Sequence, residues 1–330
     1  MQTDTRTPTL PAWALGSLRC PGGGASLKRV GDGFQAEDEQ ARVYPDTAGR
    51  PRLMQELVWR GDGGEGAGRG GESFARRLNA RLKGAASLNL ASARNYRSLR
   101  ALLESEHSRD APARVLVIGG GELGAGLEQL VDSDRIELLE SDVYPGPRVQ
   151  ILCDVHQLPF ADGSFDAVVA QAVLEHVLDP PTAAREIHRV LRPPGIVYSE
   201  IPFMQQVHEG PFDFTRFTEL GQRRLFRMFD ELDRGPVAGP GTVLAWSFRY
   251  LARSVPRRPG PAVAILDRIA VALTFWVKYA DRLVLGHPGA RDGASGTYFL
   301  GRRREQPVSD AEIIDSYRGA VAVPSRRVAR

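Results

Sequence analysis

The stretch Val115-Leu-Val-Ile-Gly-Gly-Gly-Glu-Leu-Gly124 decides the fold, because an apolar run passes there into a glycine turn and then into a helical pattern. Its first part has the β-branched character of a buried strand. Gly119, Gly121 and Gly124 follow at GxGxxG spacing, and glycines at such a turn let the backbone bend sharply and approach a ligand closely. The stretch therefore predicts a strand, a turn and a helix that together bind a nucleotide-like ligand.

Short apolar runs alternate with helical patterns on the carboxyl side of this stretch. Such alternation predicts an α/β fold with a mostly parallel sheet and helices on both faces. Ligands of such sheets bind at the carboxyl ends of the strands. The expected strands are 114–118, 136–141, 149–152, 165–170 and 196–201, and the expected helices between them include 124–131 and 181–191.

The flanking sequence divides into further segments. The glycine-dominated run GDGGEGAGRGG at 61–71 predicts a flexible linker. Periodic apolar residues predict a helical lead-in within 72–111 and helices on the substrate side of the core within 205–302. The expected helices there are 219–229, 242–253 and 262–285, followed by a last strand at 297–301 and a basic, frayed tail at 303–330.

The composition is that of an ordinary globular protein. It is 42% hydrophobic and 25% charged, with 43 Lys and Arg against 40 Asp and Glu, which excludes fibrous, wholly disordered and membrane-spanning classes. The two cysteines, Cys20 and Cys153, are far apart and predict neither a disulfide framework nor a zinc site. No secretory signal is recognised at the amino terminus, so a cytoplasmic location is expected. The most apolar stretch, 269–277, is too short to span a membrane.

The glycine turn alone does not choose between two adenosine-containing cofactors. An acidic residue about 20 positions after the first glycine can accept from a ribose diol, and both Glu140 and Asp142 stand in that range. A nicotinamide dinucleotide and S-adenosylmethionine fit this pattern equally well.

Three later motifs favour one of the two cofactors. They are Cys153-Asp-Val-His-Gln-Leu-Pro-Phe160, Ser164-Phe-Asp-Ala-Val-Val-Ala-Gln-Ala-Val-Leu-Glu-His-Val177 and Ala184-Arg-Glu-Ile-His-Arg-Val-Leu-Arg-Pro-Pro-Gly195. In this order and spacing the chain resembles the class I S-adenosylmethionine-dependent methyltransferases, over about residues 112–220. The resemblance implies a Rossmann-like sheet of seven strands, with a cofactor-binding core at 112–204.

The resemblance also implies the roles of individual residues. Gly119, Gly121 and Gly124 would lie against the amino-acid part of S-adenosylmethionine, and Asp142 would accept from the ribose hydroxyls. The adenine amino group would be bound by Asp154, beside the backbone of Val155. Gln171 would lie near the sulfonium.

One position departs from the family pattern. The acidic residue expected two positions before the first glycine is Val117, so the ammonium group of the cofactor needs another partner. Glu122 and the Asn95-Tyr96 pair are the candidates.

The residues that act on the methyl acceptor are expected between the fourth and fifth predicted strands and just beyond the fifth. His176 and His208 are candidate general bases, because histidine takes up and releases a proton near neutral pH. For His176, a helix-start residue bonding the backbone is the alternative. Asp213 and Arg216 either grip a polar acceptor or pair with each other to fix the loop. His188 is expected to be a solvated or packing residue, and Glu200 the end of a strand.

The segment 1–60 resembles the small zinc-ribbon module that accompanies some methyltransferases. Such modules carry CPxC and a second CxxC, whereas this chain keeps only Cys20 and has Gly23 at the partner position. A metal-free, degenerate ribbon is therefore expected, with no metal site in the chain.

The sequence thus predicts a methyltransferase that acts on a small molecule or glycan-linked metabolite. An RNA or protein methyltransferase is the alternative within the class, although no basic patch interleaved with aromatics favours nucleic acid. A nicotinamide-dependent oxidoreductase and a catalytically inactive binding protein are the alternatives from other classes. Segment 262–285 is assigned to core packing, with peripheral contact to a membrane or partner as its other use. The oligomeric state stays open.

Overall fold

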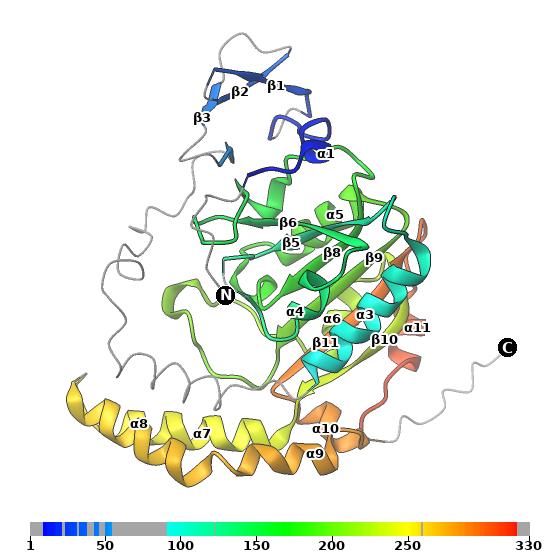
Figure 1. The fold of residues 1–330 in the computed structure, drawn as a ribbon. Helices are drawn as coiled ribbons and strands as arrows, with labels where there is room; N and C mark the ends of the chain where they lie inside the picture. Colours follow the sequence, from blue (N-terminus) through cyan, green and yellow to red (C-terminus); the bar gives the residue numbers. More distant parts are fainter. Residues whose placement is uncertain are drawn as a thin grey trace, which may run out of the picture.

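The computed structural model describes residues 9–21, 24–31, 33–37, 43–45, 50–54, 91–121, 123–258 and 260–321. The expected linker 61–71, the first part of the lead-in, Glu122 and the end of the basic tail lie outside the described residues. The described part forms a central sheet with helices on both faces (Figure 1), so the predicted α/β fold is confirmed.

The central sheet has eight strands in the order β10-β11-β9-β8-β5-β6-β7-β4. Neighbouring strands from β4 to β9 are parallel, whereas β11 runs antiparallel to both β9 and β10. Seven of these strands form the predicted mostly parallel sheet, and the two-residue β4 adds an eighth at the edge. The strands are β4 Arg52–Leu53, β5 Ala113–Ile118, β6 Ile136–Asp142, β7 Ile151–Cys153, β8 Phe165–Gln171, β9 Leu191–Pro202, β10 Phe229–Ala238 and β11 Gly296–Arg303.

The central strands are apolar throughout because both of their faces are buried. Leu116 and Ile118 of β5 pack into a cluster with helix α5, whereas Val115 and Val117 face a second cluster with helices α3 and α4. The helices that follow the first strands are α3 Ser92–Glu106, α4 Glu128–Val131, α5 Pro180–Val190 and α6 Glu219–Leu225.

Three sequence predictions need correction. The helix expected over 219–229 ends at Leu225, and β10 begins at Phe229. This strand carries Pro236 and several charged residues, which weaken a strand signal but are tolerated because β10 is an edge strand. The helix expected over 124–131 is only α4, since turns occupy the residues before it.

The third correction concerns the expected basic tail at 303–330. It contains the short helix α11 Asp310–Asp315, which is not frayed at its start. Ser309 and Glu312 form a capping box there, and this arrangement satisfies backbone donors at the beginning of a helix.

The N-terminal segment packs on the core. It contains helix α1 Ala12–Leu15 and a three-stranded antiparallel sheet of β1 Leu27–Val30, β2 Gly33–Ala36 and β3 Val43–Pro45. Leu18 pairs with Phe160, and the rings of Trp13 and Phe165 pack edge to face. The side chain of Cys20 is buried and lies 3.1 Å from the hydroxyl of Tyr44, and no described residue completes a zinc site around it.

A helical hairpin lies at the end of the molecule opposite the N-terminal sheet (Figure 1). It consists of α7 Pro240–Ser254 and α8 Pro261–Thr274, followed by the short elements η4 Val277–Ala280, α9 Asp281–Val284 and α10 Pro288–Asp292. The prediction that 262–285 packs in the core is wrong for most of α8, because Ile265, Ile269 and Leu273 are exposed. Among the described residues no helix combines the length and apolar character needed to cross a membrane.

Candidate functional site

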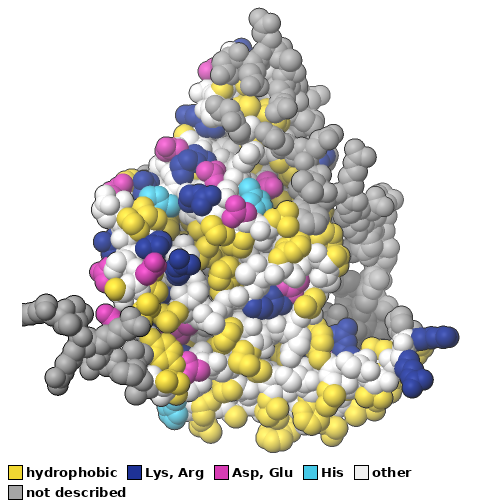
Figure 2. Space-filling model, turned by 180° about the vertical axis from the view of Figure 1, so that it is seen from behind, with side chains coloured by type: hydrophobic (Ala, Val, Ile, Leu, Met, Phe, Trp, Pro, Cys, Tyr) yellow, Lys and Arg dark blue, Asp and Glu magenta, His cyan; other side chains and the backbone are white. Residues whose placement is uncertain are grey.

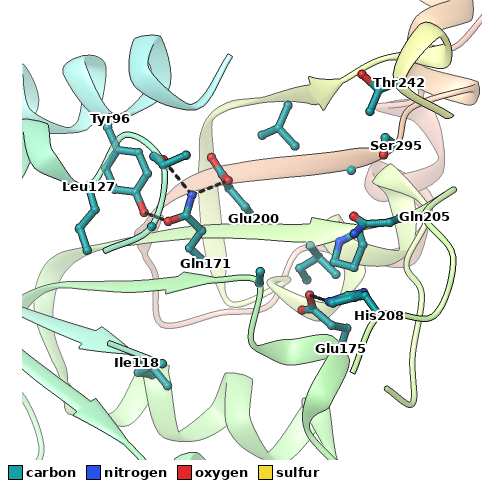
Figure 3. A pocket seen from close by; sticks show the side chains of 18 of the residues that line it. Tyr96, Ile118, Leu127, Gln171, Glu175, Glu200, Gln205, His208, Thr242 and Ser295 are labelled. Carbon is teal, nitrogen blue, oxygen red and sulfur yellow. Dashed lines mark hydrogen bonds and ion pairs between the residues drawn. The ribbon is translucent and has the colours of Figure 1, made fainter. Parts of the chain in front are cut away.

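A cavity of about 530 Å³ opens at the carboxyl ends of β5, β8 and β9, where the fold predicts a ligand. The glycine turn after β5 forms one end, and residues from β9, α7 and β11 form the other (Figure 3). Two carboxylates, Glu175 and Glu200, are among the lining residues, whereas no Lys or Arg of the described residues is. The lining therefore favours a ligand that carries positive charge.

The glycine turn leaves no room for side chains. Gly119 has a φ of +75°, and a Cβ there would lie 2.4 Å from the Cγ2 of Val173. A Cβ on Gly124 would lie 1.9 Å from the amide oxygen of Gln171. Gly119, Gly124 and Gln171 line the cavity, whereas the other predicted cofactor residues do not, namely Gly121, Asp142, Asp154 and Val155. The assignment of all seven residues to one ligand stays a prediction.

The two acidic residues at the end of β6 differ in their environment. Glu140 is engaged by Arg148, whose guanidinium donates to both of its carboxylate oxygens. Asp142 has no such cation and accepts from the backbone N–H of Gly121 at 3.1 Å and of Tyr144 at 3.0 Å. Burial raises the pKa of Asp142, and these backbone hydrogen bonds oppose the rise. Asp142 is therefore the carboxylate that remains available at the glycine turn.

Asp154 follows β7 and caps the 3₁₀ turn η1 Val155–Gln157. Its carboxylate accepts from the backbone N–H of His156 at 2.9 Å and from Nδ1 of the same ring at 2.6 Å. The Nε2 atom of His156 accepts from the backbone N–H of Asp179 at 3.1 Å, so His156 fixes the orientation of Asp154. The adenine role of Asp154 and Val155 stays a prediction.

A buried hydrogen-bonded network crosses the cavity wall from α3 to β9 (Figure 3). The Tyr96 hydroxyl donates to Oε1 of Gln171 at 3.1 Å, and Nε2 of Gln171 donates to Glu200 at 2.8 Å. Glu200 also accepts from Ser92 at 3.1 Å and from Tyr198. Burial raises the pKa of Glu200, whereas the hydrogen bonds from Tyr198, Gln171 and Ser92 lower it.

This network is relevant to the ammonium group of the cofactor, because Val117 replaces the acidic residue that the family pattern places there. Val117 lies in β5 and lines the cavity, and the candidate Glu122 lies outside the described residues. Tyr96 reaches the cavity from α3, but its hydroxyl is committed to Gln171. Glu200, expected only to end a strand, lies with its carboxylate in the cavity wall.

His208 and the buried side chain of Glu175 line the other end of the cavity, and His176 lies beside Glu175 without lining the cavity. The 3₁₀ turn η2 Leu174–His176 places Glu175 and His176 after β8, and the loop after β9 supplies His208. Glu175 Oε1 lies 3.7 Å from His176 Nε2 and 3.8 Å from His208 Nε2. Burial raises the pKa of Glu175 to about 8 and lowers the pKa of His208.

Asp213 and Arg216 form a bidentate pair in the loop after β9. Arg216 also donates to the backbone carbonyls of Gln205 at 2.9 Å and Gln206 at 3.2 Å. Its hydrogen bonds lower the pKa of Asp213 to about 2. Of the two sequence-based alternatives, the geometry favours loop fixing over direct contact with an acceptor.

Sequence reasoning missed the residues that close the far side of the cavity. Thr242 and Trp246 come from α7, and Ser295 and Gly296 come from the start of β11. These elements follow the recognisable motifs, and no local spacing marks their residues as members of a site. His188, expected to pack or be solvated, lies 2.9 Å from the carbonyl of Arg304 and packs on the ring of Phe229.

Comparison with known proteins supports the predicted methyltransferase domain. Residues 131–199 match the family model described as a methyltransferase domain. The chain carries a class I S-adenosylmethionine-dependent methyltransferase domain. This match favours the methyltransferase over the nicotinamide-dependent oxidoreductase. The degenerate zinc ribbon stays a prediction.

Relatives of the methyltransferase domain act in different reactions. The malonyl-[acyl-carrier protein] O-methyltransferase of Halorhodospira halophila is 31% identical over 150 residues, which are 41% of this chain and 50% of that protein. The ubiquinone biosynthesis O-methyltransferase of Xanthomonas oryzae is 37% identical over 103 residues, 27% of this chain and 42% of that protein. The chain thus spans half or less of the length of these curated relatives.

A solved structure of a putative sarcosine dimethylglycine methyltransferase from Galdieria sulphuraria is 15% identical. Its TM-score is 0.42, and the match covers 69% of this chain and 97% of that chain.

Proposed function

We propose that this methyltransferase domain binds S-adenosylmethionine at the glycine end of the cavity and methylates a small molecule or glycan-linked metabolite at the His208 end. The observation that carries this proposal is the cavity lining, which combines a glycine turn with two carboxylates and no described Lys or Arg. S-adenosylmethionine bears an ammonium and a sulfonium, whereas a nicotinamide dinucleotide bears an anionic pyrophosphate.

The residues at the glycine end fit the parts of this cofactor. The missing side chains at Gly119 and Gly124 leave space for its amino-acid part. For the ribose hydroxyls, Asp142 offers a carboxylate with no cationic partner among the described residues, and Asp154, directly after β7, is available for the adenine. A carboxylate is suited to these roles because charge-assisted hydrogen bonds are stronger than neutral ones.

Glu200 is our choice for the group that holds the ammonium in place of an acid at Val117. It is buried in the cavity wall and its orientation is fixed by three side-chain donors. A buried carboxylate of this kind is stabilised by a bound cation. Gln171 connects it to the glycine turn by donating also to the carbonyl of Ala125 at 3.0 Å.

When bound, the cofactor supplies an electrophilic methyl group, and the protein's main task is to align it with the acceptor. The loop held by Arg216 and Asp213 positions His208 and Gln205 at the far end of the cavity. Trp246 and Thr242 close that end and would contact the acceptor.

The test is transfer of labelled methyl groups to metabolites. Purified protein is incubated with S-adenosylmethionine labelled in the methyl group and with fractions of a cell extract, before and after ribonuclease or protease treatment. We expect label in a fraction of small molecules or glycan conjugates that neither treatment removes, and its loss with Asp142→Asn. Label confined to RNA or protein would instead establish the alternative within the class.

A further inference from the structure

The acceptor end of the cavity contains the one group of three potential metal ligands found among the described residues. It consists of Glu175, His176 and His208, whose ligand atoms lie within 4.8 Å of one another. We propose that these three side chains form a binding site for a divalent transition-metal ion.

The first observation is the unpaired carboxylate. The side chain of Glu175 is 0% exposed, and neither of its oxygens accepts a hydrogen bond from another residue among those described. Leaving a buried carboxylate without partners costs several kcal/mol, because neither water nor a donor replaces its hydration. A bound cation removes this cost.

The second observation is the orientation of the two histidine rings. His176 Nδ1 lies 2.7 Å from the backbone carbonyl of Phe212, which can only accept, so Nδ1 carries the proton and Nε2 presents a lone pair. His208 Nδ1 lies 3.3 Å from the carboxylate of Asp213 but makes no hydrogen bond with a described residue. The Nε2 atoms of both rings lie within 3.8 Å of Oε1 of Glu175, and Figure 3 shows the His208 ring beside this carboxylate.

These outer contacts are the ones that metal-binding histidines use. A ligating histidine normally donates its second nitrogen to a carbonyl or carboxylate, which fixes the ring and its tautomer. Here the Phe212 carbonyl serves His176, and Asp213, held by Arg216, stands beside His208. In addition to fixing the loop, Arg216 would hold Asp213 in position beside His208.

The ligand atoms, which lie within 4.8 Å of one another, must move closer together to coordinate an ion. Bonds of about 2.1 Å place the ligand atoms of a tetrahedral ion about 3.4 Å apart, and the two histidine nitrogens lie 3.7 and 3.8 Å from Glu175 Oε1. Two imidazoles and one carboxylate suit zinc, iron or nickel better than calcium or magnesium. The remaining coordination positions face the cavity, because Glu175 and His208 line it.

An ion at this site would favour an acceptor that carries a hydroxyl group. This part of the inference rests on the proposed function. A cation at this position would bind an oxygen of the acceptor and lower the pKa of its hydroxyl. The hydroxyl proton would leave to solvent, the C–S bond of the methyl donor would break and a C–O bond would form. His208 would then be a metal ligand instead of a general base.

The test is cobalt binding to the full chain after dialysis against a chelator, read from the visible absorption of Co²⁺ and by competition with Zn²⁺. We expect one saturable equivalent, with affinity reduced about 100-fold by Glu175→Gln or His208→Asn. The exposed residues Glu209 and His287 provide matched controls, and Glu209→Gln and His287→Asn should bind as the wild type does.

Asp213→Asn should weaken cobalt binding about tenfold, because it acts through His208. Absence of a saturable absorption band, or a band unchanged in both ligand variants, overturns the proposal and leaves a proton-sharing cluster. Thermal unfolding of each variant identifies those that have lost the fold. Binding of S-adenosylmethionine to the same samples separates the two ideas, since it can persist without metal binding.

A different observation carries a second inference, at the helical hairpin. Figure 2 shows apolar side chains along the lower edge of the molecule, where the hairpin lies. Leu251 and Leu273 are 65% and 64% exposed. The exposed apolar residues of this surface are Leu244, Phe248, Leu251, Val255, Ile265, Ile269, Leu273, Phe275, Trp276 and Leu283.

The charges of the hairpin are strongly unbalanced. Two acidic residues lie within 240–285, and both are engaged. Asp267 pairs with Arg249, and the buried Asp281 accepts from the backbone N–H of Thr242 in the first turn of α7. The exposed basic residues are Arg253, Arg257, Arg258, Arg268 and Arg282. Because apolar helices with basic residues bind at the interface of anionic bilayers, we infer that the hairpin rests on an anionic membrane surface.

Flotation of the full chain with vesicles tests this inference. We expect binding to vesicles of phosphatidylglycerol and phosphatidylcholine, weaker binding to phosphatidylcholine alone, and a decrease with salt. Leu251→Ser with Leu273→Ser should weaken binding about tenfold or more. The matched control replaces Leu232 and Ile314, which are exposed elsewhere, by serine. Failure to bind, or a dimer in solution that the first double variant dissociates, overturns the membrane assignment.

Discussion

The two ends of the cavity differ in how their polar groups are satisfied. At the glycine end, Tyr96, Gln171 and Glu200 form a continuous hydrogen-bonded network, and Asp142 accepts from two backbone N–H groups. At the acceptor end, both oxygens of Glu175 lack a hydrogen-bond donor from any other described residue. The two ends therefore differ in the hydrogen-bond partners of their polar groups.

This difference indicates what each end requires from a ligand. A satisfied network keeps its geometry before a ligand arrives, which lowers the entropy that binding must overcome. An unsatisfied buried carboxylate is stable only if something else neutralises it, such as a metal ion or a proton. We therefore propose that the glycine end is preformed for the cofactor and that a second component completes the other end.

The largest expected effect is at the glycine turn. Gly119→Ala adds a Cβ 2.4 Å from Val173 at a φ of +75°, and it should abolish binding of S-adenosylmethionine, measured by calorimetry. Gly210→Ala is the matched control, because Gly210 also has a positive φ, +56°, but no atom within 4 Å. It should lower the free energy of unfolding by about 1–2 kcal/mol without changing affinity. Equal effects of the two variants would show that backbone strain alone matters.

A smaller effect is expected at the end of β6. Asp142→Asn should weaken cofactor binding about tenfold or more, because the amide no longer supplies a charged acceptor to the ribose. Glu140→Gln should leave affinity nearly unchanged but lower the free energy of unfolding by about 1–3 kcal/mol, since it weakens the pairing with Arg148. Calorimetry and denaturant unfolding measure the two quantities. The reverse pattern would reassign the ribose to Glu140.

Glu200→Gln tests the network itself and should weaken binding about tenfold while Tyr96 and Gln171 stay in place. If Glu200 holds the ammonium, S-adenosylhomocysteine loses affinity equally. A loss restricted to S-adenosylmethionine would move the contact to the sulfonium. Unchanged affinity for both ligands would remove Glu200 from the cofactor site.

The same residue predicts a dependence on pH. Burial raises the pKa of Glu200 in the folded protein, and a bound cation favours the ionised form. Affinity should therefore rise as the pH increases through that pKa, and this rise should be absent in Glu200→Gln. The stability contributed by this carboxyl group to the free protein has the opposite trend: it is full below the unfolded pKa of about 4.3 and is lost as pH rises through the folded pKa.

The smallest effect concerns the access of solvent and reagents to Cys153, which directly precedes the predicted adenine-binding residue Asp154. Cys153 is 3% exposed, and burial raises the pKa of its thiol to about 12. In a Cys20→Ser variant, the remaining thiol should react with a disulfide reagent at pH 8 at least about 100-fold more slowly when folded than when unfolded. Rapid reaction of the folded protein would show that this edge opens in solution.

Much of the cofactor end could be predicted from sequence because its signals are local. The strand, the glycine spacing and the acidic residue follow one another within a short stretch, and each has a separate physical reason. The structure accordingly brings Gly119, Gly124 and Gln171 to one cavity. Strand β10 could not be predicted in the same way, because an edge strand that carries Pro236 and alternating charges lacks an apolar pattern.

The acceptor end could be predicted only in part. His176 and His208 were candidates by residue type, but Glu175 gave no signal, since its burial between them depends on a turn after β8 and on a distant loop. The site role of Glu200 could not be predicted from the sequence for a related reason. A single acid in an apolar strand is marked only by the partners that surround it, and Ser92 and Gln171 are remote in sequence.

Calorimetric titration of the full chain with S-adenosylmethionine, and separately with NADH, tests the central claim most directly. We predict saturable binding of S-adenosylmethionine at one site, which Gly119→Ala abolishes and Gly210→Ala preserves, and no binding of NADH. Saturable binding of NADH together with no heat from S-adenosylmethionine would contradict the account.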